Sequence, residues 1–291
     1  MDILLVFNSV PWLFYTAVVL FSLCIGSFLN VVIYRLPVIL DREWKIQCHE
    51  YLDISDSEPD AATAQLGLAT PASSCPHCGH AIRAWENIPV ISYLLLRGRC
   101  SACAASISLQ YPLIEIATAL LSVVVAYTFG VSVQTLAALV FTWMLIALTM
   151  IDIHKQLLPD SLTLPLLWLG LLFALFGTFA PLQDCVIGAI AGYGVLWLVF
   201  QLFRLVTGKE GMGFGDFKLL AALGAWAGWM MLPQIVLVSS VIGAIVGITM
   251  LITGRTRTQQ PIPFGPYLAL AGWIALLWGD SINRAYLSTL H

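Results

Sequence analysis

Long apolar runs recur along this sequence, and they constrain its fold more than any other feature. A helix needs roughly 20 apolar residues to cross a bilayer, so runs of this kind predict several spans rather than one anchor. Only 10% of the 291 residues are charged, whereas a typical soluble domain carries about a quarter. We place spans at about 11–32, 113–131, 136–151, 162–179, 186–205, 217–229, 235–252 and 267–278. The sequence therefore predicts an all-α polytopic membrane protein with about eight transmembrane helices.

One long polar stretch interrupts this pattern between the first and second spans. From Arg35 to Gln110 it holds 14 of the 29 Lys, Arg, Asp and Glu residues. We therefore predict a first transmembrane helix at 1–36, a small soluble domain at 37–110 and a seven-helix membrane core at 111–291. Residues 53–72 lack a periodic apolar pattern, which predicts a mobile loop.

The basic residues predict the orientation, because Lys and Arg in short loops collect on the cytoplasmic side. With eight spans, twelve of the thirteen fall on the side of the soluble domain, and only Arg284 lies opposite. The soluble domain is therefore expected in the cytoplasm and both termini outside. The net charge of -3 gives no reason to expect binding to nucleic acid.

Four cysteines in the polar stretch are typical of a metal site. Cys75 and Cys78 form one Cys-x-x-Cys pair, Cys100 and Cys103 form a second, and 21 residues separate the pairs. This spacing is close to that of four-thiolate zinc ribbons. Four protein ligands leave no open position for water, so the zinc is expected to be structural.

Disulfide bonds between these cysteines, or histidine in place of one thiolate, are less favoured alternatives to this zinc site. Two disulfides are the alternative, but a cytoplasmic location keeps thiols reduced. His77 and His80 are expected at the surface, although either could replace a thiolate. Cys24 and Cys185 are expected to pack in the core of the membrane helices.

Carboxylates near the membrane are costly to bury and are therefore candidates for function. Asp152 ends the third span and Asp216 opens the sixth, both on the side predicted to be cytoplasmic. For each, the alternative is a plain helix-end carboxylate, and for Asp216 an N-cap. Asp160, Glu115 and Glu210 lie near the same face, so position alone does not choose a pair. Gly211, Gly213 and Gly215, in GMGFGDFK, are expected to let the backbone turn sharply and approach another chain beside Asp216.

The Gly-x-Gly-Asp motif ending at Asp216, with Asp152 located 64 residues upstream, resembles the GxGD intramembrane aspartyl proteases. Within that group the chain resembles the bifunctional type IV prepilin peptidases. Further matching stretches run from Gly26 to Gly279: GSFLNVVIYRLP, the double Cys-x-x-Cys domain, WENIPVISYL, YPLIEIATALL, IDIHKQLLPD, TGKEGMGFGDFKLL and PFGPYLALAGWIALLWG.

The resemblance implies an enzyme of the bacterial inner membrane with Asp152 and Asp216 as its catalytic pair. Its substrates would be prepilins and pseudopilins of type IV pili and type II secretion, cleaved after Gly at the cytoplasmic face. It also implies methylation of the new amino terminus with S-adenosylmethionine, for which the chain shows no Rossmann fingerprint. Two alternatives remain open: a peptidase of this family without methylation, and a transporter that uses membrane carboxylates.

Overall fold

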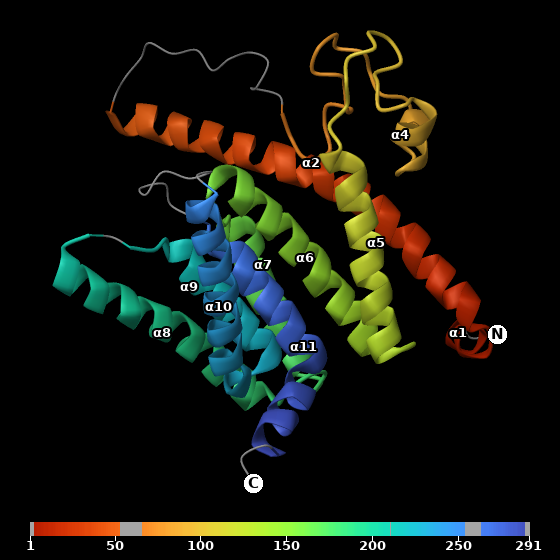
Figure 1. Cartoon of the computed structure of the whole chain (residues 1–291). Coiled ribbons are helices and arrows are strands. Elements are labelled where there is room, and N and C mark those ends of the chain that lie inside the picture. Colours follow the sequence, from red (N-terminus) through yellow and green to blue (C-terminus); the bar gives the residue numbers. More distant parts are fainter. Residues whose placement is uncertain (1–2, 53–65, 210, 254–262, 289–291) are drawn as a thin grey trace. The chain divides into compact units, whose positions relative to one another are not determined.

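The computed structural model describes residues 3–52, 66–209, 211–253 and 263–288, and these are mostly helical (Figure 1). They contain no strand, only two isolated β-bridges. The chain divides into two compact units, Met1–Val131 and Ser132–His291. The first unit contains α1 (Ile3–Ser9), α2 (Pro11–Leu52), η1 (Ala84–Asn87), α4 (Ile91–Leu95) and α5 (Gln110–Phe129). The second contains α6 (Val133–Lys155), α7 (Asp160–Ala174), α8 (Leu182–Thr207), α9 (Phe214–Ala227), η2 (Trp229–Met231), α10 (Leu232–Ile252) and α11 (Gly265–Ser288).

Each predicted span falls largely on one of these helices, in the order α2 and α5 to α11. Five helical segments of the described chain are long and apolar enough to cross a membrane. They are Pro11–Leu52, Gln110–Phe129, Val133–Lys155, Leu182–Thr207 and Trp229–Ile252. Helix α7 is apolar but has only 15 residues, and α9 has 14. The prediction of a helical membrane protein is confirmed, whereas the total of eight crossings stays a prediction.

Helix α2 is longer than the first predicted span. It continues past Val32 to Leu52, with Pro37 inside it, so the predicted boundary at 36/37 lies within one helix. Hydropathy marks only the part of a helix suited to lipid, whereas helix propensity continues through the polar residues that follow. An exposed ion pair of 2.8 Å between Lys45 and Asp41, spaced i and i+4, supports the polar half.

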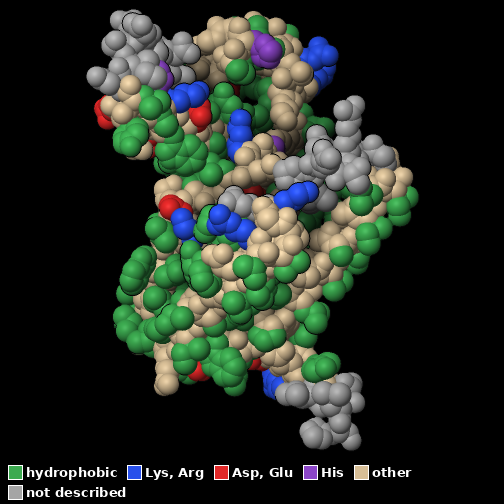
Figure 2. Space-filling model, turned by 90° about the vertical axis from the view of Figure 1, so that its left-hand side faces the viewer, with side chains coloured by type: hydrophobic (Ala, Val, Ile, Leu, Met, Phe, Trp, Pro, Cys, Tyr) green, Lys and Arg blue, Asp and Glu red, His purple; other side chains and the backbone are tan. Residues whose placement is uncertain are grey.

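Exposed apolar side chains are common on the helices, as expected for a protein in lipid. Figure 2 shows hydrophobic side chains over much of the visible helical surface. On α8, Ile190 is 70% exposed, and on α10 Leu237 is 64% exposed. Because lipid is as apolar as these side chains, their exposure on a membrane helix is compatible with its stability.

In the first unit, α2 and α5 pack side by side through a small residue and a buried amide. A Cβ on Gly26 would lie 2.7 Å from the Cα of Glu115, so only glycine permits this approach. The Asn30 amide donates to the carbonyl oxygens of Gly26 (3.2 Å) and Tyr111 (3.1 Å). The contact between α2 and α5 therefore accounts for Gly26 and Asn30 in the GSFLN stretch, which meet the YPLIE stretch at Tyr111 and Glu115.

The second unit is organised around α9, which packs against α7, α8 and α11. The backbones of α8 and α9 meet directly, since a Cβ on Gly224 would lie 2.2 Å from the carbonyl oxygen of Gly188. Between α9 and α7, the buried Trp226 indole donates to the Leu166 carbonyl oxygen at 2.8 Å. The fifth and sixth predicted spans are thus in close contact through glycine.

We expect Gly224→Ala to destabilise the second unit by about 1–3 kcal/mol or more, as overpacking does in a dense core. The added methyl group meets backbone, which has no alternative rotamer. Thermal unfolding in detergent measures this effect. Gly194→Ala on α8 is the matched control, because its Cβ would have no heavy atom within 4 Å. Equal stability of the two variants would contradict the direct backbone contact.

Candidate active site and metal centre

The structure places Asp152 and Asp216 at neighbouring helix ends of the second unit. Asp152 lies in the last turn of α6, and Asp216 lies in the first turn of α9. Both are buried, with 5% and 9% of their surfaces exposed, and the charge on Asp152 acts on the Asp216 carboxyl. Asp216 is the third residue of α9 and not its N-cap, which is Gly213. Two carboxyl groups that interact in a buried site resist joint ionisation, so they can share one proton.

A backbone amide at the start of α11 holds the Asp152 carboxyl. The N–H of Gly265 donates to Asp152 Oδ2 at 3.1 Å. A Cβ on Gly265 would lie 2.6 Å from the same oxygen, so the contact requires glycine. Gly265 lies in the stretch PFGPYLAL, which resembles the family in sequence but for which no function was predicted. The sequence feature that could have indicated this role is a glycine between Phe264 and Pro266, directly before an apolar span.

The segment between α6 and α7 fills the space beside this pair. Leu158 is buried, and its side chain would lie 2.8 Å from a Cβ on Gly215 and 3.3 Å from one on Gly265. One leucine thus contacts the beginnings of both α9 and α11. The IDIHKQLLPD stretch therefore contributes packing as well as Asp152.

The glycines before Asp216 lie in different surroundings. Gly213 and Gly215 have no positive φ, so their backbone conformations are open to other residues as well. Gly211 packs on the Phe203 ring and Gly215 on Leu158, and both contacts are internal to the chain. Gly211 and Gly213 are both exposed, but of these three glycines only Gly213 has open space where a Cβ would lie, so it leaves the most room for another chain.

The remaining candidate carboxylates are engaged elsewhere. Asp160 accepts from Lys218 Nζ at 2.6 and 2.8 Å, an exposed pair that joins the start of α7 to α9. Glu115 belongs to the first unit and accepts the Val90 N–H at 2.7 Å. Glu210 lies outside the described residues. Among the described carboxylates, Asp152 and Asp216 are the buried pair that the structure brings together in the second unit.

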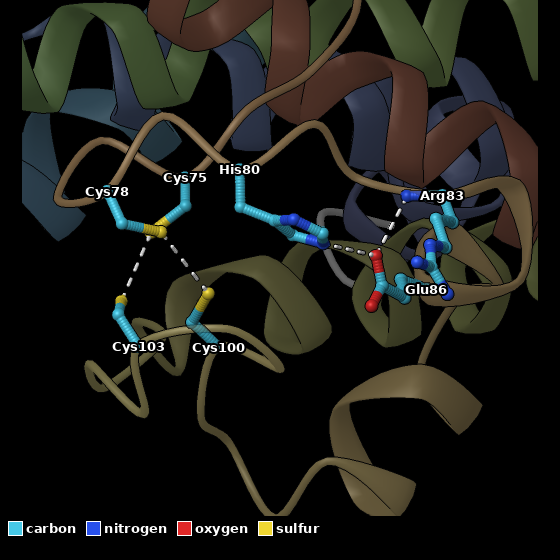
Figure 3. A network of polar contacts seen from close by, with 7 residues as sticks. All are labelled: Cys75, Cys78, His80, Arg83, Glu86, Cys100 and Cys103. Carbon is cyan, nitrogen blue, oxygen red and sulfur yellow. Dashed lines mark hydrogen bonds and ion pairs between the residues drawn. The ribbon is translucent and has the colours of Figure 1, made fainter.

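The four cysteines of the polar stretch form one cluster (Figure 3). The sulfurs of Cys75, Cys78, Cys100 and Cys103 all lie within 4.8 Å of one another. Cys75 and Cys103 are 3.8 Å apart, and Cys78 and Cys100 are 4.0 Å apart. Tetrahedral zinc with bonds of about 2.3 Å separates its sulfurs by about 3.8 Å. The cluster therefore has the dimensions of a four-thiolate zinc site, and none of the four cysteines is in a disulfide.

Backbone amides prepare two of these sulfurs, those of Cys75 and Cys100, to bind metal as thiolates. The N–H groups of Cys78 and His77 donate to the Cys75 sulfur and lower the pKa of this thiol to about 7. The N–H of Cys103 likewise lowers the pKa of Cys100. Each turn is closed by a residue at positive φ whose N–H donates to the carbonyl oxygen of the first cysteine: Gly79 (φ +71°) to Cys75 and Ala104 (φ +59°) to Cys100. Thiolates are the form that binds zinc, so these amides favour it.

The Glu86 carboxylate contacts residues in or beside both cysteine turns. Its carboxylate lies 3.4 Å from His80 Nε2 and accepts the Arg83 N–H at 2.8 Å (Figure 3). A hydrogen bond from the Ser101 hydroxyl, together with the Arg83 N–H, lowers the pKa of Glu86. His80 is thus partly buried beside Glu86 and not a free surface residue, whereas His77 is exposed as predicted. Sequence spacing gave no sign of this carboxylate.

The two cysteines predicted in the core differ from each other. Cys185 is 1% exposed on α8, as predicted. Cys24 is exposed on α2, so the prediction that it packs in the core is wrong. Periodicity in a wholly apolar helix does not reveal which face meets protein and which meets lipid.

Comparison with known proteins finds two family matches. Residues 20–129 match the family described as Bacterial Peptidase A24 N-terminal domain, and residues 139–248 match the Type IV leader peptidase family. No solved structure matches the chain.

Several curated proteins similar to the chain bear the name prepilin leader peptidase/N-methyltransferase. The protein from Aeromonas salmonicida (strain A449) is 59% identical over 283 residues, 97% of each chain. That of Pseudomonas aeruginosa is 56% identical over 96% of this chain and 95% of its own. That of Legionella pneumophila is 49% identical over 95% of this chain and 96% of its own.

Proposed function

Because the chain belongs to the type IV leader peptidase family, we propose that it cleaves prepilin and pseudopilin leaders and methylates the new amino terminus. The observation that carries this proposal is identity of 49–59%, over nearly the full length, to proteins named for both activities. The buried pair of Asp152 and Asp216 supports the first activity. A membrane-bound substrate, a prepilin with an apolar helix, suits a chain with several membrane-spanning helices.

In the proposed cleavage, Asp152 and Asp216 share one proton and act as base and acid. The ionised carboxylate takes a proton from water, and the resulting hydroxide attacks the carbonyl carbon of the Gly that precedes the cleavage site. The protonated carboxyl group donates its proton to the carbonyl oxygen. The other carboxyl then passes the proton it took from water to the leaving nitrogen, and as the C–N bond breaks a hydroxyl proton of the tetrahedral diol returns to the first carboxylate, so no covalent enzyme intermediate forms. The Gly265 N–H supports this role, because its hydrogen bond orients Asp152.

Methylation is proposed to follow cleavage, since it needs a freed amino group. S-adenosylmethionine would supply the methyl group: the amino terminus would first lose one proton, the neutral amine would displace S-adenosylhomocysteine from the methyl carbon, and the product would be a methylammonium. We place this activity in or near the domain that carries the four cysteines.

A single experiment tests both activities. The purified chain is incubated with a prepilin, with and without S-adenosylmethionine, and the product mass is measured. We expect loss of the leader in both cases and gain of one methyl group only with the cofactor. Cleavage without methylation would favour a peptidase alone, and neither reaction would favour the transporter alternative.

We further propose that Cys75, Cys78, Cys100 and Cys103 hold one structural zinc ion, and elemental analysis should find one zinc per chain. Cys100→Ser should lose most of this zinc and the fold of its domain, because metal binding contributes folding free energy. Cys48→Ser is the control, since Cys48 is an exposed cysteine outside the cluster. A chain without stoichiometric metal, or full zinc in Cys100→Ser, would refute the site.

The proposed location is the bacterial inner membrane, with Asp152, Asp216 and the cysteine cluster at the cytoplasmic face. Cysteines introduced at Lys155 and Asp184 test this topology with an impermeant maleimide on intact cells, against the background of the unmodified chain. We expect label at position 184 and none at 155 until the cells are opened. Label at position 155 in intact cells would overturn the orientation.

A further inference from the structure

An exposed apolar segment of the first unit has four side chains that the described residues of this unit leave uncovered. Residues 88–95 read IPVISYLL and include α4. Four of their side chains are strongly exposed: Ile88 (42%), Ile91 (54%), Leu94 (69%) and Leu95 (71%). Their spacing of three and four residues is that of one helical face, and backbone bonds from Ser92 to Ile88 and from Leu94 to Val90 continue the turn.

The segment is held in a strained conformation by a buried carboxylate. Val90 has φ +60° and ψ -48°, and Ile91 N–H donates to the Pro89 carbonyl oxygen at 2.5 Å, which together make a γ-turn. A β-branched residue at positive φ costs free energy and persists only where surrounding contacts fix it. Here the Val90 N–H donates a hydrogen bond to the carboxylate of Glu115 on α5. Glu115 is buried, with 7% of its surface exposed.

This hydrogen bond sets the level of the segment along α5. Glu115 is the sixth residue of α5, and helical side chains lean toward the N-terminus. Val90 therefore lies beside the first turns of an apolar helix that is long enough to cross a membrane. On α5, Leu113 (60%) and Leu120 (62%) form part of an exposed apolar stripe that begins at the same level.

Basic residues follow the apolar side chains directly. Arg97 and Arg99 are exposed and form no ion pair with any described residue. Apolar side chains at membrane-interface level, with arginines at their border, are the pattern of a segment lying in the headgroup region. Arginine there binds lipid phosphates, and the apolar side chains enter the acyl region.

We propose that residues 88–95 are an interfacial membrane anchor of the cysteine-containing domain. Ile88, Ile91, Leu94 and Leu95 contact the hydrocarbon of the bilayer, and Arg97 and Arg99 bind anionic phospholipid headgroups. Glu115 is the positioning residue, because its carboxylate holds the Val90 turn at this level. The anchor does not depend on the proposed peptidase or methyltransferase activity.

Spin labels in the full chain, reconstituted in vesicles of phosphatidylcholine and phosphatidylglycerol, test the hydrocarbon contact. A ketone-bearing amino acid at position 94 or 95 carries the label, which avoids the native cysteines, and the exposed Ala72 of the same domain is the control site. We expect a several-fold higher ratio of oxygen to nickel-chelate collisions at 94 and 95 than at 72. Equal ratios would mean that the segment lies in water, and low collision rates with both reagents would mean that protein covers it; either result overturns the proposal.

Two further variants test the arginines and Glu115. In the chain with Arg97→Ser and Arg99→Ser, label depth at position 94 should no longer differ between vesicles with and without phosphatidylglycerol. A depth independent of lipid charge in the parent chain would refute the phosphate contact. In Glu115→Gln the segment should keep its shallow contact with the membrane, because an amide oxygen still accepts the Val90 N–H. In Glu115→Leu, which has no acceptor, this contact should be lost. Unchanged label depth in Glu115→Leu, with zinc content intact, would remove Glu115 from its positioning role.

Discussion

Asp152→Asn and Asp216→Asn are each expected to lower the rate of leader cleavage by roughly a thousandfold or more, within the range lost with general acid–base catalysis. Asparagine preserves the size of the side chain, and the Gly265 N–H can still donate to its amide oxygen at position 152. It cannot, however, accept a proton from water or share one across the pair. Single-turnover cleavage of a purified prepilin by membrane-reconstituted enzyme measures the loss.

Asp160→Asn is the matched control for both variants. It removes one charge from the same region, but Asp160 is exposed and pairs with Lys218, and such pairs contribute about 0–1 kcal/mol. We expect near-normal cleavage. An inactive Asp160→Asn beside an active Asp152→Asn would show that the pair is wrongly assigned.

Measuring methylation shows whether these variants have lost only the peptidase activity or their folded structure as well. A pre-cleaved pilin already has a free amino terminus, so Asp216→Asn should still methylate it. If methylation fails while membrane insertion and zinc content are normal, the two activities share the aspartates.

Gly265→Ala is expected to lower leader cleavage by about a hundredfold, the cost of a displacement on the order of 1 Å at a reacting group. The new methyl group would lie 2.6 Å from Asp152 Oδ2 and 3.2 Å from its Cγ. Since the carboxyl group must move away, it loses both the Gly265 N–H and its position relative to Asp216. Comparing cleavage with methylation of a pre-cleaved pilin measures a specific effect on the peptidase.

Gly194→Ala supplies the control for Gly265→Ala, because the same change on α8 meets no heavy atom within 4 Å. It should leave cleavage and thermal stability unchanged. Normal cleavage by Gly265→Ala would mean that the contact between Gly265 and Asp152 is dispensable.

Much of this fold was predictable because a bilayer permits few solutions. Backbone groups in lipid must be satisfied within a helix, so apolar runs of sufficient length predict helices directly. The cysteine cluster was predictable for a similar reason, since two Cys-x-x-Cys turns supply four sulfurs that a single tetrahedral ion can gather. The positions of Asp152 and Asp216 at helix ends followed from the same runs.

The contacts between helices were not predictable, because they depend on pairs of residues far apart in the sequence. The N–H of Gly265 reaches Asp152 across 113 positions, and Glu115 reaches Val90 across 25. The length of α2 was missed for another reason: beyond Leu40 its residues are largely polar but still favour a helix. The roles of Gly211 and Gly215 depend on Phe203 and Leu158, which no motif links to them.

The direct backbone contact between α8 and α9 also limits how the Asp216 carboxyl group can move. Side chains change rotamer on the picosecond to nanosecond timescale, but Gly188 and Gly224 meet without side chains. Rotamer exchange therefore cannot widen the separation of these two helices there. Asp152, by contrast, is held by the first residue of α11 and by a loop leucine. A backbone contact thus holds α9 against α8, whereas a single hydrogen bond and one leucine side chain position Asp152.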